Sequence, residues 1–197
     1  LSLFMTCGFP TVSQSKKVFD EILSHQPDII EFGLPFSDPM ADGPIIQESS
    51  KVALKSKITT KQSLTLISQL KKKSEKTAFV IMCYLNTVQK YGVQKFIKEI
   101  KNIVDGIIIV DLPFEEEKPI KKLLDKNGVY LIKLISPMTD QQRSKKLLKE
   151  AKDAGNKVLL TFKDNKQLKP CPYVKTILAK SVEGSIVEQE TRWIGSV

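Results

Sequence analysis

Two carboxylates, Glu31 and Asp42, are the residues whose setting in the sequence best suits a catalytic role. Glu31 lies within the apolar stretch 29–34, and apolar surroundings raise the pKa of a carboxyl toward neutrality. A carboxyl tuned in this way can both donate and accept protons as a general acid–base group. Taken alone, Glu31 also suits a buried ion-pair partner, and Asp42 suits an Asx turn before a Gly-Pro pair.

The elements that must position these carboxylates alternate along the chain. Apolar runs that we interpret as strands cover residues 3–7, 29–34, 78–84, 106–111 and 130–135. Helical spacing of apolar residues lies between them, and a long loop is expected at 35–44. Toward the C-terminus, 157–162 and 185–187 read as strands, so seven strands at most are expected.

Strands that are apolar on both faces and alternate with helices predict a parallel sheet covered by helices. A doubly wound sheet and a closed barrel both fit, but GxGxxG is absent after the first strand and GxxxxGK[ST] is absent throughout. Polar residues instead end several strands, as on the catalytic face of a barrel. They are Thr6, Glu31, Asp111 and Ser136. We therefore predict an α/β fold, a TIM (β/α)8 barrel, as a single domain over residues 1–197.

Composition excludes several other classes of protein. The chain has 197 residues, 41% of them hydrophobic and 27% charged, which is ordinary for a globular domain. The net charge is +9, but the lysines are scattered and not interleaved with aromatic residues, so we expect no nucleic-acid partner. No apolar run approaches the roughly 18 residues of a membrane span, so no membrane association is expected.

The three cysteines form no CxxC pair, and Cys7 and Cys83 lie in strand-like runs typical of buried, reduced thiols. This usage predicts a cytoplasmic setting without disulfides. No cluster of metal-ligand residues is apparent, so no metal site is expected. The N-terminus shows no signal peptide, and the first residues of the natural chain are interpreted as absent.

The stretch 31–47 reads Glu-Phe-Gly-Leu-Pro-Phe-Ser-Asp-Pro-Met-Ala-Asp-Gly-Pro-Ile-Ile-Gln. It closely resembles the signature of the tryptophan synthase alpha chain family, and the motif is long and free of gaps. Segments 4–10, 82–86 and 110–113 resemble the family's first, third and fourth strand ends. The resemblance covers residues 1 to about 150.

This resemblance implies a lyase that cleaves indole-3-glycerol phosphate to indole and glyceraldehyde 3-phosphate in tryptophan biosynthesis. Glu31 matches the catalytic acid–base residue, and Asp42 matches the anion near the indole N–H, where positive charge develops. Phe4 and Met82 match positions that line the indole pocket, although both also suit plain barrel core. Asp111 matches a substrate-binding position.

The resemblance also implies a partner. Five residues of the loop match the segment that faces the beta chain in the family: Pro35, Phe36, Ser37, Asp38 and Pro39. The two prolines stiffen this loop. An α2β2 tetramer is expected, with pyridoxal phosphate only in the beta chain and no cofactor in this one.

The family pattern fails toward the C-terminus. The sixth strand and its mobile loop are not found, so one βα unit is interpreted as missing, or not showing, between about 152 and 156. The phosphate-binding glycines are replaced at 161–164 and 187–189, where Lys163 is a candidate substitute and Glu188 would repel phosphate.

These departures leave alternatives to the active lyase open. One is a catalytically weakened or inactive subunit that docks on a beta chain and activates it. Another, weaker one is a different phosphate-sugar or indole-binding barrel, including an indole-releasing relative that does not require docking.

Overall fold

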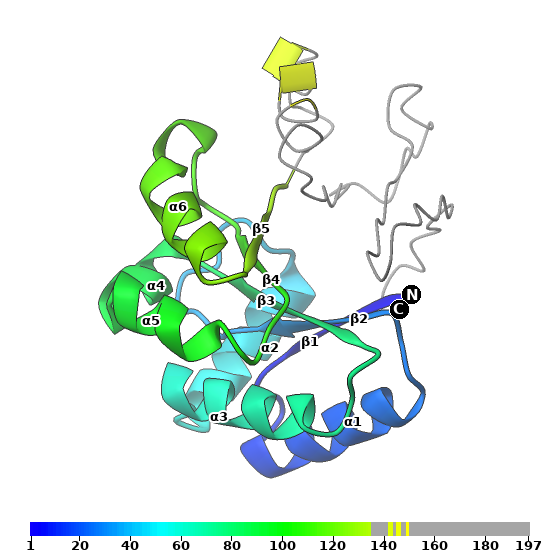
Figure 1. Ribbon diagram of the computed structural model, residues 1–197. Coiled ribbons are helices and arrows are strands. Elements are labelled where there is room, and N and C mark those ends of the chain that lie inside the picture. Colours follow the sequence, from blue (N-terminus) through cyan, green and yellow to red (C-terminus); the bar gives the residue numbers. More distant parts are fainter. Residues whose placement is uncertain (135–141, 144, 147–148, 150–197) are drawn as a thin grey trace. The chain divides into compact units, whose positions relative to one another are not determined.

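The computed structural model describes residues 1–134, 142–143, 145–146 and 149 (Figure 1). The chain divides into two compact units, Leu1–Leu131 and Ile132–Val197. The first unit holds the parallel sheet and most of the described helices. In the second unit, the described residues from 142 to 149 are helical and exposed, where a helix is expected. The expectation of a single domain over 1–197 stays a prediction.

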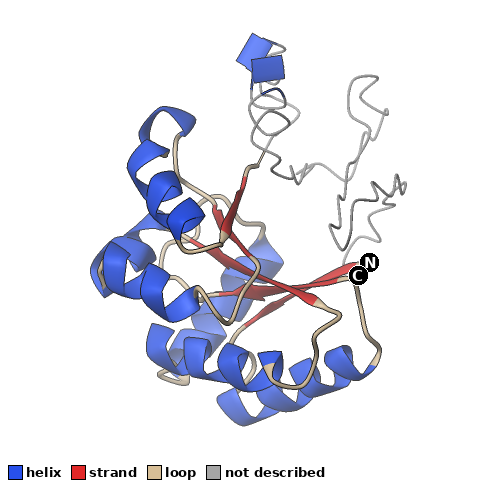
Figure 2. Ribbon diagram, viewed as in Figure 1, coloured by secondary structure: helices blue, strands red, loops and turns tan. Residues whose placement is uncertain are grey.

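The first unit is built on strands that follow one another in space as they do in sequence. The strands are β1 Ser2–Thr6, β2 Ile29–Gly33, β3 Ala78–Cys83, β4 Gly106–Ile109 and β5 Tyr130–Ile132. The sheet order is β1-β2-β3-β4-β5, and the pairs β1–β2, β2–β3 and β3–β4 are parallel (Figure 2). A doubly wound sheet reverses its order at a switch point. The sequential order is that of a barrel wall.

Helices connect the strands. They are α1 Val12–Ser24, α2 Pro44–Lys55, α3 Thr60–Lys71, α4 Leu85–Tyr91, α5 Val93–Ile100, the 3-10 turn η1 Phe114–Glu116 and α6 Lys118–Lys126. The strands expected at 3–7, 29–34, 78–84, 106–111 and 130–135 and the helices α1, α3, α5 and α6 are confirmed within a few residues. The strands expected at 157–162 and 185–187 lie outside the described residues. The side chain of Thr11 accepts a hydrogen bond from the backbone N–H of Gln14, which begins α1.

Helices α2 and α4 were not expected from the pattern of apolar residues. Pro44 occupies the first turn of α2, a position that proline favours because its fixed φ suits a helix start and it has no N–H to leave unpaired. The expected loop at 35–44 therefore ends in a helix. Helix α4 starts at Leu85, directly after the strand expected over 78–84.

Alternation of side chains along paired strands gives the sheet two faces. The helix face carries Phe32 and Phe79, and the ring of Phe19 from α1 packs on Phe32 at 4.7 Å between centroids. The rings of Phe32 and Phe79 follow at 5.0 Å. All three phenylalanines are fully buried, so this face forms the main core between sheet and helices.

The opposite face, which we name the site face, is defined by the register of the strands. Its residues are Ser2, Phe4, Thr6, Ile29, Glu31, Gly33, Ala78, Val80, Met82, Gly106 and Ile108. Glu31 pairs with Phe4 on one side and with Val80 on the other. Among these residues Glu31 is the one ionisable side chain.

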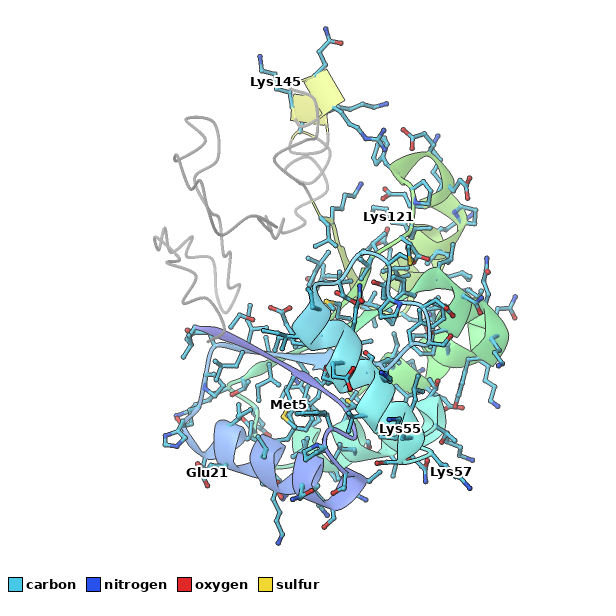
Figure 3. All side chains as sticks on the ribbon, turned by 180° about the vertical axis from the view of Figure 1, so that it is seen from behind. Met5, Glu21, Lys55, Lys57, Lys121 and Lys145 are labelled. Carbon is cyan, nitrogen blue, oxygen red and sulfur yellow. The ribbon has the colours of Figure 1, made fainter. Side chains whose placement is uncertain are left out.

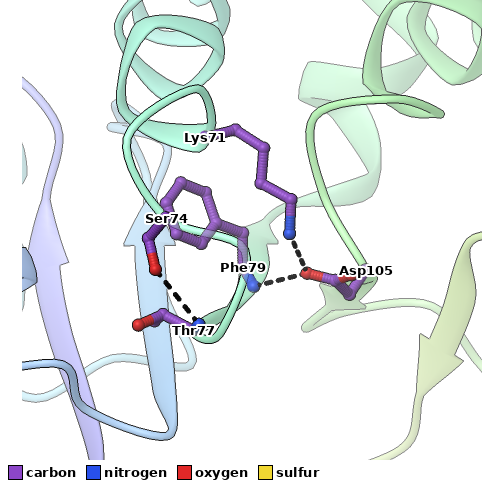
Figure 4. A network of polar contacts seen from close by, with 5 residues as sticks. All are labelled: Lys71, Ser74, Thr77, Phe79 and Asp105. Atoms are coloured by element: carbon purple, nitrogen blue, oxygen red, sulfur yellow. Dashed lines mark hydrogen bonds and ion pairs between the residues drawn. The ribbon is translucent and has the colours of Figure 1, made fainter. Parts of the chain in front are cut away.

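A polar network closes the amino end of the sheet (Figure 4). The side chain of Asp105 accepts a hydrogen bond from the backbone N–H of Phe79 at 2.7 Å. It also forms an ion pair with the ammonium of Lys71 at 2.8 Å. The ammonium of Lys71 also lies 4.9 Å from the centroid of the Phe79 ring. Ser74 accepts from the N–H of Thr77, whose own buried hydroxyl has no hydrogen-bond partner among the described residues.

The thiols of Cys7 and Cys83 are free and buried, as expected. Burial raises the pKa of Cys7 to about 12, so this thiol is not a nucleophile at neutral pH. Cys171 lies outside the described residues.

Lysines are distributed over separate parts of the first unit. Lys55 and Lys57 lie at and just beyond the end of α2, whereas Lys121 lies on α6 (Figure 3). Such scattering differs from the single basic stripe that nucleic-acid binding favours. In the part of the chain that the structure describes, no helix has the length and apolar character needed to cross a bilayer.

Candidate active site

Glu31 is a carboxyl placed in apolar surroundings in the middle of β2, and not at the carboxyl end of the strand as expected. Its residue is 7% exposed, and its neighbours across the strands are Phe4 and Val80. Burial raises the pKa of Glu31 above its ordinary value, and a hydrogen bond from the Ser2 hydroxyl to Oε1, at 2.6 Å, acts in the opposite direction. A carboxyl with a raised pKa is suited to exchange protons near neutral pH.

Asp42 is held by a residue from another part of the chain. The hydroxyl of Tyr84, just after β3, donates a hydrogen bond to Oδ2 of Asp42 at 2.9 Å. The same hydroxyl accepts a hydrogen bond from the backbone N–H of Ala41 at 3.0 Å. Burial, followed by the hydrogen bond to Asp42, raises the pKa of Tyr84, so its hydroxyl stays protonated and acts as a donor.

The loop that carries the predicted partner-binding residues is anchored at the same tyrosine. The ring of Phe36 stacks on that of Tyr84 at 4.9 Å between centroids and an interplanar angle of 20°. Ser37 and Asp38 are exposed and hydrogen-bonded to each other, while Pro39 is buried and Pro35 is partly buried. The loop therefore has an inner side held at Tyr84 and an exposed tip at Ser37 and Asp38.

The two predicted pocket residues lie on the site face. The ring of Phe4 lies over Gly33, where an added Cβ would come within 2.6 Å of the ring. Met82 pairs with Gly33 from the other side. Both Phe4 and Met82 are partly buried. Gly33 thus gives the aromatic ring its place beside Glu31, because any side chain there would displace it.

Asp111 lies beyond β4 and has an immediate structural contact. Its Oδ1 accepts a hydrogen bond from the backbone N–H of Leu85 at 2.6 Å, in the first turn of α4. The carboxylate satisfies one of the N–H groups that a helix start leaves without an intrahelical partner. Its predicted substrate contact stays a prediction.

The structure brings the predicted residues together in two sets. Glu31, Phe4 and Met82 share the site face, and Asp42 shares Tyr84 with the loop 35–39. The expected phosphate-site substitutions at 161–164 and 187–189, and the interruption at 152–156, lie outside the described residues. Among the residues described, no group of three His, Cys, Asp or Glu side chains could hold a metal ion.

Sequence reasoning assigned no role to Tyr84 or Ser2. Tyr84 ends an apolar run in the sequence, and a tyrosine in that position is a signal for a polar contact at the end of the strand. Ser2 gave no local signal, because its partner Glu31 is 29 residues away in sequence.

The family model for the tryptophan synthase alpha chain matches residues 1–154. The alpha chain from Clostridium acetobutylicum is 42% identical over 150 residues, which cover 76% of this chain and 56% of the relative. That from Thermoanaerobacter pseudethanolicus is 40% identical over 153 residues, covering 77% and 58%. The chain thus spans a little over half the length of these curated relatives. The match ends near the interruption expected at 152–156.

Solved structures also match this chain in fold. The alpha chain from Legionella pneumophila matches with a TM-score of 0.72 and 30% identity over 82% of this chain and 60% of that one. A tryptophan synthase complex from Pyrococcus furiosus matches with a TM-score of 0.71 and 31% identity, covering 82% and 77%. The predicted TIM barrel fold is confirmed by these neighbours. Since the family model matches residues 1–154, in agreement with the motif at 31–47 and the fold of the described residues, the chain belongs to the tryptophan synthase alpha chain family.

Proposed function

We propose that this chain cleaves indole-3-glycerol phosphate to indole and glyceraldehyde 3-phosphate in tryptophan biosynthesis. Family membership supports the reaction class. The observation that carries the proposal is the burial of Glu31 on the site face, where no other residue is ionisable within β1–β4. A lone carboxyl in apolar surroundings is the group that a reversible proton transfer to carbon requires.

The reaction needs two proton movements and one bond cleavage. Glu31 gives its proton to C3 of the indole ring, which makes the ring a leaving group. It then takes the proton of the side-chain hydroxyl as the carbon–carbon bond breaks and the aldehyde forms. The bonding electrons return to the ring, so the products are indole and the aldehyde, and Glu31 is again protonated.

Asp42 stabilises the positive charge that develops at the ring N–H when C3 is protonated. The hydroxyl of Tyr84 fixes one oxygen of this carboxylate, and a fixed anion needs little reorganisation when the charge appears. Phe4 and Met82 provide apolar walls for the indole, and Asp111 contributes to substrate binding. The chemistry needs no cofactor from this chain, and pyridoxal phosphate belongs to the beta partner.

The partner we propose is a tryptophan synthase beta chain, in an α2β2 assembly. The exposed tip of the loop 35–39 and its anchoring at Tyr84 support docking there. A complex from Pyrococcus furiosus is among the matching structures. We place the chain in the cytoplasm, a setting that the free thiols of Cys7 and Cys83 suit.

The test is indole release from indole-3-glycerol phosphate by the purified chain, alone and with a beta chain. Glu31→Gln is expected to lower the rate by roughly 10²- to 10⁴-fold, the range that general acid–base groups contribute. Glu21→Gln, at an exposed glutamate of α1, is the matched control and should leave the rate unchanged. No indole from a folded wild-type chain under either condition would overturn the proposal. Activation of the beta chain in that case would support the docking subunit instead.

A further inference from the structure

Glu31 has a polar neighbour that the proposed reaction leaves unused. The hydroxyl of Ser2 donates a hydrogen bond to Oε1 of Glu31 at 2.6 Å. Ser2 pairs with Ile29, two residues before Glu31, so the contact runs diagonally across the first two strands of the site face. The carboxyl oxygen Oε2 of Glu31 makes no hydrogen bond with the described residues.

Ser2 acts on a carboxyl that has few other polar influences. On the site face, the remaining positions of β1–β4 carry apolar side chains, glycines and the hydroxyl of Thr6, which contacts Ser49 instead. The hydroxyl of Ser2 can donate to the ionised carboxylate and thereby favours the charged form that burial disfavours.

The charged groups on the helix that packs against β1 are engaged elsewhere or lie at its end. On α2, Lys51 pairs with Glu48 at 3.4 Å, with both side chains more than half exposed, and Lys55 lies in the last turn. Beyond the strand ends, Asp42 is bound by Tyr84 and Asp111 by Leu85. Ser2 is therefore the direct polar contact through which the described fold acts on the carboxyl of Glu31.

We propose that Ser2 is a positioning residue for the acid–base carboxyl: its hydroxyl holds Oε1 of Glu31 and leaves Oε2 to exchange the proton with substrate. The catalytic part of this inference rests on the proposed function. The effect of Ser2 on the ionisation of Glu31 does not, because the titration can be followed without substrate.

The experiment uses three substitutions of Ser2 in the full chain. Ser2→Ala removes the hydroxyl, and Ser2→Val and Ser2→Thr differ from each other by a methyl in place of a hydroxyl. The Glu31 carboxyl is titrated by NMR on chains carrying ¹³C at the glutamate side-chain carboxyl, and its signal is assigned by its loss in Glu31→Gln. The pH dependence of indole release is measured on the same samples. Thr65→Val, which removes an exposed hydroxyl bonded within its own helix, is the control.

The Ala and Val variants are expected to move the titration midpoint of Glu31 to higher pH by about half a pH unit or more, because a donor to the charged form is lost. The limb of the pH–rate profile set by Glu31 should move with it, whereas Ser2→Thr and Thr65→Val should match the wild type. An unchanged midpoint in the Ala and Val variants would overturn the proposal. So would an equal shift in the Thr and Val variants, since packing rather than the hydroxyl would then be responsible. A shifted midpoint in a chain that releases no indole would support the contact with Ser2 and refute the proposed function.

Discussion

At the amino end of the sheet, Asp105 accepts a hydrogen bond from the backbone N–H of Phe79 at 2.7 Å, and beyond the carboxyl end Asp111 accepts one from Leu85 at 2.6 Å. The two contacts are alike, but their surroundings differ. Asp105 also pairs with the charge of Lys71. Nearby at the carboxyl end, Asp42 is held by a neutral hydroxyl, which orients a carboxylate without neutralising it.

The difference indicates that the two ends of the sheet have different roles. The ion pair with Lys71 of α3 compensates the charge of Asp105, and the hydrogen bond from the N–H of Phe79 ties β3 to the residue before β4. At the carboxyl end, hydrogen bonds from Tyr84 and Leu85 orient the carboxylates of Asp42 and Asp111. In (β/α)8 barrels the carboxyl ends of the strands carry the catalytic residues, and the amino ends serve stability. Variants at the amino end should therefore change stability, and variants at the carboxyl end should change the reaction.

The largest effect on stability is expected at Asp105. Asp105→Ala removes the acceptor for the N–H of Phe79 as well as the partner of Lys71, and should lower the free energy of unfolding by about 2 kcal/mol. Asp105→Asn keeps an acceptor oxygen and should lose less than half as much. Urea unfolding checks both, and equal losses in the two variants would show that the charge, not the backbone contact, is what matters.

A smaller effect, on the reaction, is expected for Tyr84→Phe. Loss of the hydroxyl frees the carboxylate of Asp42 from its fixed position, and kcat for indole release should fall about tenfold. The matched control is Tyr91→Phe, which also removes a tyrosine hydroxyl from a carboxylate, that of Glu99, but on α4 and α5. A rate that falls equally in both variants would contradict the role of Tyr84 in holding Asp42.

Glu31 should lower stability, unlike the carboxylate of Asp105. The pKa of Glu31 in the folded chain is raised above its ordinary value of 4.5. The free energy of unfolding is therefore greatest below pH 4.5 and falls as the pH rises through the pKa of the folded chain. Glu31→Gln lacks this loss and should exceed the wild type in free energy of unfolding at pH 8 more than at pH 4. Denaturant unfolding at the two pH values measures the difference, and a gap that does not widen with pH would refute the burial of an ionisable carboxyl as its cause.

The ion pair of Lys71 with Asp105 should contribute less to stability than the hydrogen bond that Asp105 accepts from Phe79. The side chain of Lys71 is 24% exposed and that of Asp105 is 47% exposed, so solvent screens the pair. Lys71→Met keeps an apolar stem over the Phe79 ring and should cost below about 1 kcal/mol. Thermal unfolding at low and high salt checks this, because the loss should shrink as salt rises; a loss independent of salt would point to packing.

The smallest effect is expected at Thr77, also near the amino end. Its buried hydroxyl has no hydrogen-bond partner within the described part of the chain, so Thr77→Val should leave stability within about 0.5 kcal/mol of the wild type or raise it. Thr77→Ser, which keeps the hydroxyl and removes the methyl, is the comparison. A clear drop in Tm for the Val variant would mean that the hydroxyl has a stabilising contact.

Sequence reasoning located most of the elements because their signals are local. The strand around Ile107 follows from its run of apolar residues, and α5 follows from apolar residues at helical spacing. The boundaries at Pro44 and Leu85 were missed for different reasons. Pro44 was read as the end of a turn, whereas α4 starts where Asp111, distant in sequence, reaches the N–H of Leu85.

By itself, the sequence determined the family motif over residues 31–47, the alternation of strands and helices, and the carboxylates Glu31 and Asp42, because these are written in neighbouring residues. Only the tertiary structure decided what those carboxylates touch. Ser2 meets Glu31 and Tyr84 meets Asp42 across separations of 29 and 42 residues. Such contacts depend on strand register and on the path of the loop, and a short window of sequence encodes neither.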